Sequence, residues 1–135
     1  MTIWRTMLVP ALLLALTASV AQPAQAVAVQ KKVLVEFRRQ GGFAGFDDRV
    51  IVYTDGCAKV SRRTAPAAVK CLTKAEMRTL RGHLKRLRIG PSQAQPQGAD
   101  HLKYTLAYRG QRASRYTLTR RWTPVVRDLE KLLAK

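Results

Sequence analysis

Two different spacings of apolar residues limit the folds that this chain can adopt. Apolar and polar residues alternate in the segments 32–39, 102–109 and 115–119, which is the pattern of strands with one buried side. The segment 49–54 is expected to form a further strand, which the Asp55-Gly56 turn signal ends. In two other segments apolar residues recur every three or four positions, as they do in amphipathic helices. A domain that buries both kinds of apolar face together packs helices against a sheet.

Both helices have start signals. Thr73 and Glu76 form a capping box, in which the hydroxyl and the carboxylate satisfy free amides at a helix start. This helix is expected to end near Gly90-Pro91. The second helix is expected at Thr123-Pro124, an N-cap followed by proline at the first helical position. The apolar stripes are Met77, Leu80, Leu84 and Leu87 in the first helix, and Val125, Val126, Leu129, Leu132 and Leu133 in the second.

The remaining segments complete the element order. A basic, partly β-branched stretch at 59–64 follows the Asp55-Gly56 turn signal and is a possible third strand. Residues 90–100 are rich in Pro, Gln and Gly and are expected to form a loop. Gly110 separates the last two strands, which we expect to form a hairpin. We therefore predict an α+β fold, with a small antiparallel sheet of four to five strands and two helices packed on one face.

The first 26 residues resemble a secretory signal peptide. Arg5 precedes a mostly apolar run at 7–16, and the segment ends in the Ala24-x-Ala26 pattern of a cleavage site. The run is shorter than the roughly 20 apolar residues that a membrane span needs. We predict cleavage after Ala26, secretion without a membrane anchor, and a single domain at 27–135. The alternative is an uncleaved membrane anchor.

The chain has two cysteines, Cys57 and Cys71. Export places them in an oxidising compartment, where an even pair most simply forms one disulfide. A cross-link at this sequence separation stabilises a domain by about 3 kcal/mol in the chain-entropy estimate. The alternative is a redox-active or metal-binding thiol pair, which would require a Cys-x-x-Cys motif or a nearby histidine, and neither occurs.

The charge is strongly positive. The whole chain has a formal net charge of +17, and removal of Arg5 with the signal peptide leaves +16. Such a surface favours anionic partners, including cell-wall polymers, acidic protein surfaces and nucleic acid. The cations are scattered along the sequence and no recognised nucleic-acid-binding motif accompanies them, so we expect no specific nucleic acid.

Few side chains are suited to catalysis. His83 and His101 belong to no cluster with the spacing of zinc ligands. Asp47 and Asp48 are adjacent in an expected loop, so their side chains should point to opposite sides and either remain solvated or pair with arginines. We expect a binding protein rather than an enzyme, without catalytic residues, metal or cofactor. A small enzyme that uses His101 or Asp47 is the weakest alternative.

The most unusual segment is Gly41-Gly42-Phe43-Ala44-Gly45. Its three glycines permit positive φ angles and close approach to another surface, and they flank one large aromatic side chain. Two interpretations are open. Phe43 folds back into the core at a tight connection between strands, or it points outward toward a partner.

With this motif, the chain resembles the emfourin family, proteinaceous inhibitors of protealysin and related thermolysin-like zinc metalloproteases. The resemblance rests on the strand 33–38 running into the glycine motif, the central amphipathic helix, the strand 102–106 with its Gly110 turn, and the helix after Pro124. In element order it covers essentially the whole mature chain. This chain departs from the family in its basic charge, its two cysteines, and the segment Thr119-Arg120-Arg121-Trp122, where family members carry acidic residues.

The resemblance implies a monomeric inhibitor whose partner is a thermolysin-like metalloprotease. An inhibitor of this kind fills the active-site cleft with a preorganised segment. Thermolysin-like enzymes prefer a large apolar side chain just after the scissile bond, so we expect Phe43 to occupy that pocket. Backbone groups of Gly41, Gly42, Ala44 and Gly45 would contact the cleft. The alternative function is that of a secreted basic protein which binds anionic cell-wall polymers or nucleic acid through its charge.

Overall fold

The computed structural model describes residue 21, residues 30–98 and residues 100–135. Apart from residue 21, the expected signal peptide at 1–26 lies outside the described residues. The elements are β1 (Val33–Gly41), β2 (Phe46–Tyr53), β3 (Cys57–Arg62), β4 (Ala65–Cys71), α1 (Lys74–Arg86), β5 (Leu102–Tyr108), β6 (Gln111–Arg115) and α2 (Trp122–Ala134). Within the described residues, no helix has the length and apolar character that a membrane crossing requires.

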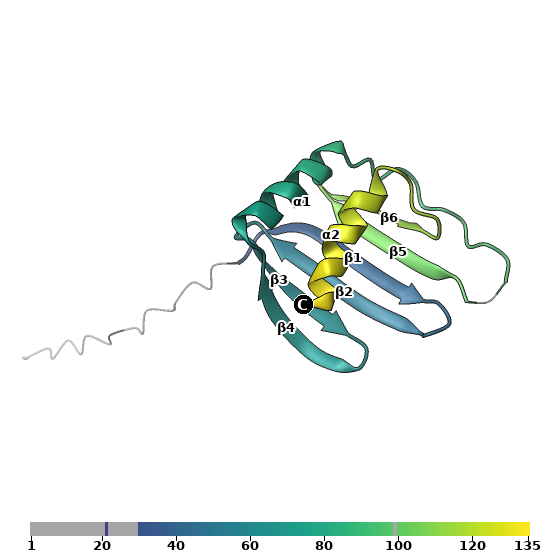
Figure 1. Cartoon of the computed structure of the whole chain (residues 1–135), viewed down its shortest axis with the longest axis horizontal. Helices are drawn as coiled ribbons and strands as arrows, with labels where there is room; N and C mark the ends of the chain where they lie inside the picture. Colours follow the sequence, from purple (N-terminus) through teal and green to yellow (C-terminus); the bar gives the residue numbers. More distant parts are fainter. Residues whose placement is uncertain (1–20, 22–29, 99) are drawn as a thin grey trace, which may run out of the picture.

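All six strands form one antiparallel sheet in the order β4-β3-β2-β1-β5-β6. One face of this sheet carries the core. Phe37 of β1 is fully buried there, opposite Val50 of β2 and Leu106 of β5. Both helices lie on this side, with α2 across the sheet and α1 beside it (Figure 1). The structure is therefore α+β, with two helices and one antiparallel sheet.

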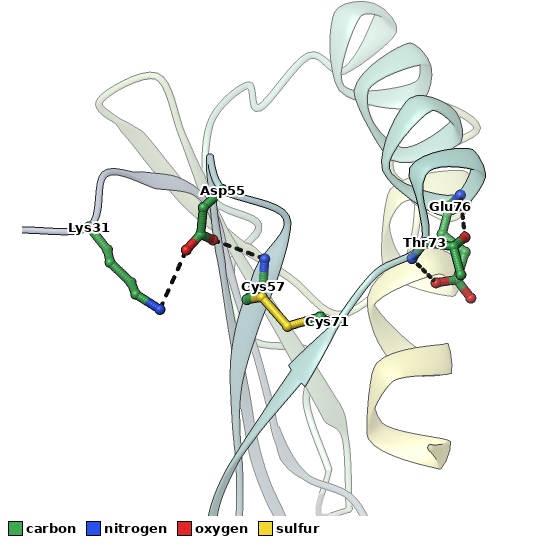
Figure 2. Close-up of a disulfide and its surroundings, with 6 residues drawn as sticks. All are labelled: Lys31, Asp55, Cys57, Cys71, Thr73 and Glu76. Atoms are coloured by element: carbon green, nitrogen blue, oxygen red, sulfur yellow. Dashed lines mark hydrogen bonds and ion pairs between the residues drawn. A yellow bond between two sulfur atoms is a disulfide. The ribbon is translucent and has the colours of Figure 1, made fainter.

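The expected number of four to five strands is wrong, because the sheet has six. The missed strand is β4, with the sequence Ala-Pro-Ala-Ala-Val-Lys-Cys, in which every residue except Lys70 is exposed. A strand without a buried side has no apolar alternation, so its sequence carries no strand pattern. Backbone pairing with β3 and a disulfide between Cys57 and Cys71, which lie directly opposite each other, hold β4 in place (Figure 2).

The start of α1 agrees with the expected capping box. The backbone amide of Thr73 donates to the Glu76 carboxylate at 2.8 Å, and the amide of Glu76 donates to Thr73 Oγ1 at 3.1 Å (Figure 2). The helix ends at Arg86, earlier than the expected end near Gly90. Leu87 and Ile89 nevertheless remain buried, so the apolar stripe continues into the segment that follows the helix.

The expected strand at 115–119 is placed too late, since β6 spans Gln111–Arg115. Arg109 and Gly110 have φ angles of 49° and 74°, and Tyr108 lies directly opposite Gln111. Positive φ at both central residues is the geometry of a two-residue hairpin turn, so β6 begins immediately after Gly110.

The expected N-cap of the last helix, Thr123, is also wrong. The helix α2 begins at Trp122, and its N-cap, Arg121, makes no capping hydrogen bond through its side chain. Instead the carbonyl oxygen of Thr119 accepts hydrogen bonds from the amides of Trp122 and Thr123 at 3.1 and 3.0 Å. The indole of Trp122 is fully buried and its Nε1 donates to the carbonyl oxygen of Arg88 at 3.0 Å. This core residue was missed because it directly follows two arginines.

Candidate functional site

The turn between β1 and β2 presents Phe43 to solvent. Its side chain is 95% exposed, more than that of any other large apolar residue in the described part of the chain. The amide of Gly45 donates to the carbonyl oxygen of Gly42 at 3.0 Å, which closes the turn below the aromatic ring. Of the two interpretations of Phe43, the core position is therefore excluded.

Contacts from both sides fix the backbone of this loop, which we define as residues Gly41–Gly45. On one side the amide of Gly42 donates to the carbonyl oxygen of His101 at 3.1 Å. On the other side Arg63 Nη1, from the turn between β3 and β4, donates to the carbonyl oxygen of Gly45 at 3.1 Å. The φ angles of Gly41, Gly42 and Gly45 are 80°, 71° and 62°, a region in which other residues are strained.

Ion pairs connect the base of the loop to the helix α2. The guanidinium of Arg39 lies 4.3 Å from the centroid of the Phe46 ring. The same guanidinium forms ion pairs with Asp48 at 2.7 Å and with Glu130 of α2 at 3.0 Å. The Phe46 end of the loop is thereby connected to the helix-covered face of the sheet.

Asp47 and Asp48 lie in β2 and not in a loop, so their expected location is wrong. Their side chains point to opposite faces of the sheet, as expected for neighbours in an extended segment. Asp47 pairs with Arg38 at 2.9 Å, and Asp48 pairs with Arg39. The expected pairing with arginines is confirmed for both carboxylates.

The tip of the loop retains unused backbone groups. Among the described residues, no hydrogen-bond partner is found for the amides and carbonyls of Phe43 and Ala44. Beside the tip lies a hollow of about 300 Å³, whose charged lining residues are the cations Arg39, Arg62 and Arg63 and the carboxylates Asp47 and Asp48. The loop therefore combines an exposed aromatic side chain and free backbone donors and acceptors with a flank of mixed charge.

The two histidines have structural partners. His83 Nδ1 lies 2.6 Å from Asp128 Oδ2, across the contact between α1 and α2. His101 Nε2 lies 3.0 Å from the carbonyl oxygen of Gln97. Each histidine therefore has a polar partner within the fold. In the part of the chain that the structure describes, no group of three or more His, Cys, Asp or Glu side chains is arranged to hold a metal ion.

Among the described residues, the pKa is shifted from its usual value at three separate places. The hydrogen bond from the backbone amide of Cys57 lowers the pKa of Asp55. The hydrogen bond from Lys135 lowers the pKa of Glu76. Burial raises the pKa of Tyr104. These groups belong to a turn, a helix start and a strand, and each cause is a structural contact, so they indicate no shared catalytic centre.

Comparisons of the chain with protein-family models, with curated proteins and with solved structures find no match. The resemblance to the emfourin family therefore remains a prediction.

Proposed function

We propose that this protein is a secreted inhibitor of a thermolysin-like zinc metalloprotease, and that the Gly41–Gly45 loop blocks the active-site cleft of the enzyme. The observation that carries the proposal is Phe43, which is 95% exposed at the tip of a loop whose backbone is fixed on both sides. A single exposed apolar residue is ordinary on a protein surface. A phenylalanine at the tip of a constrained glycine loop is a more specific arrangement.

The constraint on the loop favours binding through entropy. A flexible loop must be ordered when it enters a cleft, and fixing the backbone of each residue costs about 1–2 kcal/mol of conformational entropy. Here the hydrogen bonds from Gly42 to His101 and from Arg63 to Gly45 already order the backbone in the free protein. The loop therefore loses little conformational freedom on binding.

The chemistry of the tip fits a protease cleft. Phe43 supplies the large apolar side chain that the pocket after the scissile bond of a thermolysin-like enzyme accepts. The unpaired backbone groups of Phe43 and Ala44 are available to hydrogen-bond with the edge of the cleft. No chemical step is required of the inhibitor, because occupation of the cleft is sufficient to exclude substrate.

The test is inhibition of thermolysin, measured with the parent protein and with Phe43→Ala. We expect the substitution to weaken inhibition by about tenfold or more, since an aromatic anchor in a desolvated pocket commonly contributes about 2 kcal/mol. Phe43→Leu keeps a large apolar side chain and should retain most of the inhibition. Val69→Ala removes another exposed apolar side chain, on β4, and serves as the matched control.

Two results would overturn the proposal. One is a folded Phe43→Ala protein that inhibits as strongly as the parent. The other is a parent protein that inhibits none of several thermolysin-like proteases.

A further inference from the structure

Four cations form a stripe along one face of α1. Lys74, Arg78, Arg81 and Lys85 recur at spacings of four, three and four residues and are all exposed. Residues at these spacings lie above one another on a helix. Among the described residues none of the four belongs to an ion pair with a carboxylate. The stripe therefore presents unneutralised positive charge along the helix.

The C-terminal half of this stripe borders a groove between α1 and the adjacent end of the sheet. The groove has a volume of about 450 Å³. Its lining includes four cations from three separate parts of the chain, and none of its lining residues is acidic. The cations are Lys32, Arg81, Lys85 and Arg109, and the other lining residues are Val33, Leu34, Thr54, Leu84 and Tyr108.

Specific contacts bring these three parts together. Arg81 Nη2 donates to the carbonyl oxygen of Thr54 at 3.2 Å, and the amide of Thr54 donates to the carbonyl oxygen of Lys32 at 2.9 Å. Tyr108 lies opposite Val35 of β1, which places Arg109, in the β5–β6 turn, near the start of β1. The cations around the groove are thus positioned by the fold, although they are far apart in the sequence.

The acidic residues of the protein do not neutralise the groove. Seven of the eight form ion pairs within the described residues, and in every case the partner is a cation outside the groove. Four exposed cations gathered around one groove without a counter-charge attract an anion more strongly than cations scattered over the surface.

We infer that this groove binds a linear phosphodiester polymer. Phosphate groups would neutralise the four cations at its rim, and the carbon segments between phosphates would pack on the apolar floor beside Tyr108. A polymer fits better than a single phosphate because the cationic stripe continues beyond the groove through Arg78 and Lys74. This inference is independent of the proposed inhibition.

The groove and the Gly41–Gly45 loop lie at opposite ends of β1, because β1 begins at Val33 in the groove and ends at Gly41 in the loop (Figure 1). Nine residues of strand span roughly 26–30 Å. One molecule would therefore be able to hold an anionic polymer with one end and present the loop to another protein with the other.

The test is a binding titration against two probes, a labelled single-stranded 20-nucleotide oligothymidylate and a polyglycerol phosphate teichoic acid. The groove variant is Lys32→Gln/Lys85→Gln/Arg109→Gln, which leaves the Arg81 hydrogen bond in place. The control variant is Lys59→Gln/Arg62→Gln/Arg127→Gln, which removes three exposed cations outside the groove. Both variants lower the net charge equally, and unchanged thermal midpoints confirm that both are folded.

We expect the groove variant to bind at least tenfold more weakly than the parent, and the control variant to lose less than threefold. Affinity for the oligothymidylate falls as the salt concentration rises, and the plot of log affinity against log salt has a negative slope. This slope should be less steep by about 2 in the groove variant, since three cations are removed and each single-strand phosphate contact contributes about 0.7. The Phe43→Ala protein should bind both polymers with the same affinity as the parent protein.

The two probes identify the source of the phosphodiester. If only binding of the oligothymidylate depends on the groove, the ligand is a nucleic acid. If only binding of the teichoic acid depends on it, the ligand is a cell-wall polymer. If binding of both depends on it, the groove recognises the phosphodiester backbone that the two polymers share. Equal losses in the two triple variants would show that only overall charge matters and would overturn the inference. Failure of the parent to bind either probe would overturn it as well.

Discussion

A Cβ atom on Gly41 would lie 2.8 Å from the carbonyl oxygen of His101, closer than such atoms approach in proteins. The segment before β5 therefore sits directly against the start of the exposed loop. The hydrogen bond from Gly42 to the same carbonyl oxygen reinforces this contact. The position of the loop consequently depends on a residue about sixty positions away in the sequence.

Gly41→Ala should destabilise the protein more than Gly110→Ala. Both glycines have φ angles in the left-handed region, 80° and 74°, so each substitution carries a backbone penalty of about 1–2 kcal/mol. Only Gly41 has an atom within 4 Å of the added methyl group. Urea denaturation measures the difference between the two variants. Equal losses would mean that the segment at His101 moves aside without cost.

Phe37→Ala should destabilise the protein far more than Phe43→Ala. Phe37 is fully buried between the sheet and the helices, and its removal should cost about 3–5 kcal/mol of unfolding free energy. Phe43 is 95% exposed, so its removal should change stability by about 0.5 kcal/mol or less. The comparison requires only thermal or urea denaturation. A large loss for Phe43→Ala would indicate that the ring packs against the protein in solution.

The disulfide should be the main support of β4. Replacing both Cys57 and Cys71 with Ser should lower the free energy of unfolding by about 3 kcal/mol. Hydrogen exchange should accelerate most at Ala67–Val69, because this part of β4 buries no side chain and depends on β3 for its order. Mass analysis of the unreduced protein should show one disulfide. Two thiols that alkylate freely would contradict this prediction.

The capping box should make α1 sensitive to acid. The hydrogen bond from Lys135 lowers the pKa of Glu76 below its usual value of 4.5. A carboxyl group with a lower pKa in the folded state stabilises the protein above its unfolded-state pKa, and this contribution is lost as the pH falls through the folded-state pKa. Glu76→Gln keeps an acceptor at the same position and removes the charge. Its thermal midpoint should be lower than that of the parent at about pH 7, and the difference should shrink at about pH 2.5.

An NMR titration checks the cause directly. In Lys135→Gln the pKa of Glu76 should rise toward 4.5, since the first of its stabilising partners is lost. An unchanged pKa would assign the effect to the Thr73 amide alone.

Apolar periodicity predicted α1 and β1, which both contribute to the core, but it placed the strand of the buried Ala113 at 115–119, too late in the chain. The stripe containing Leu80 and Leu84 predicted α1, and the alternation around Val35 and Phe37 predicted β1, because both patterns record burial on one side. Local hydrogen-bonding signals were equally informative at Thr73 and Glu76, whose capping contacts involve neighbours in the sequence.

Elements without a buried side were not predictable in this way. Strand β4 exposes nearly all its residues, and its place in the sheet is set by backbone pairing with β3. The buried position of Trp122 depends on the carbonyl oxygen of Arg88, more than thirty residues earlier. Such partners are distant in the sequence, so no local pattern reports them.

The same distinction applies to the two proposed binding surfaces, the Gly41–Gly45 loop and the cationic groove. The sequence by itself determined that a glycine-rich segment with one aromatic residue joins two strands, and that the protein is strongly basic. Only the tertiary structure decided that Phe43 is exposed, on a loop that is contacted by His101 from the segment before β5 and by Arg63 from the β3–β4 turn. It also decided which cations share a groove, since Lys32, Arg81 and Arg109 meet only when the sheet and α1 are assembled. Charge and local turn propensity are properties of the residues themselves, whereas proximity between distant residues is created by folding.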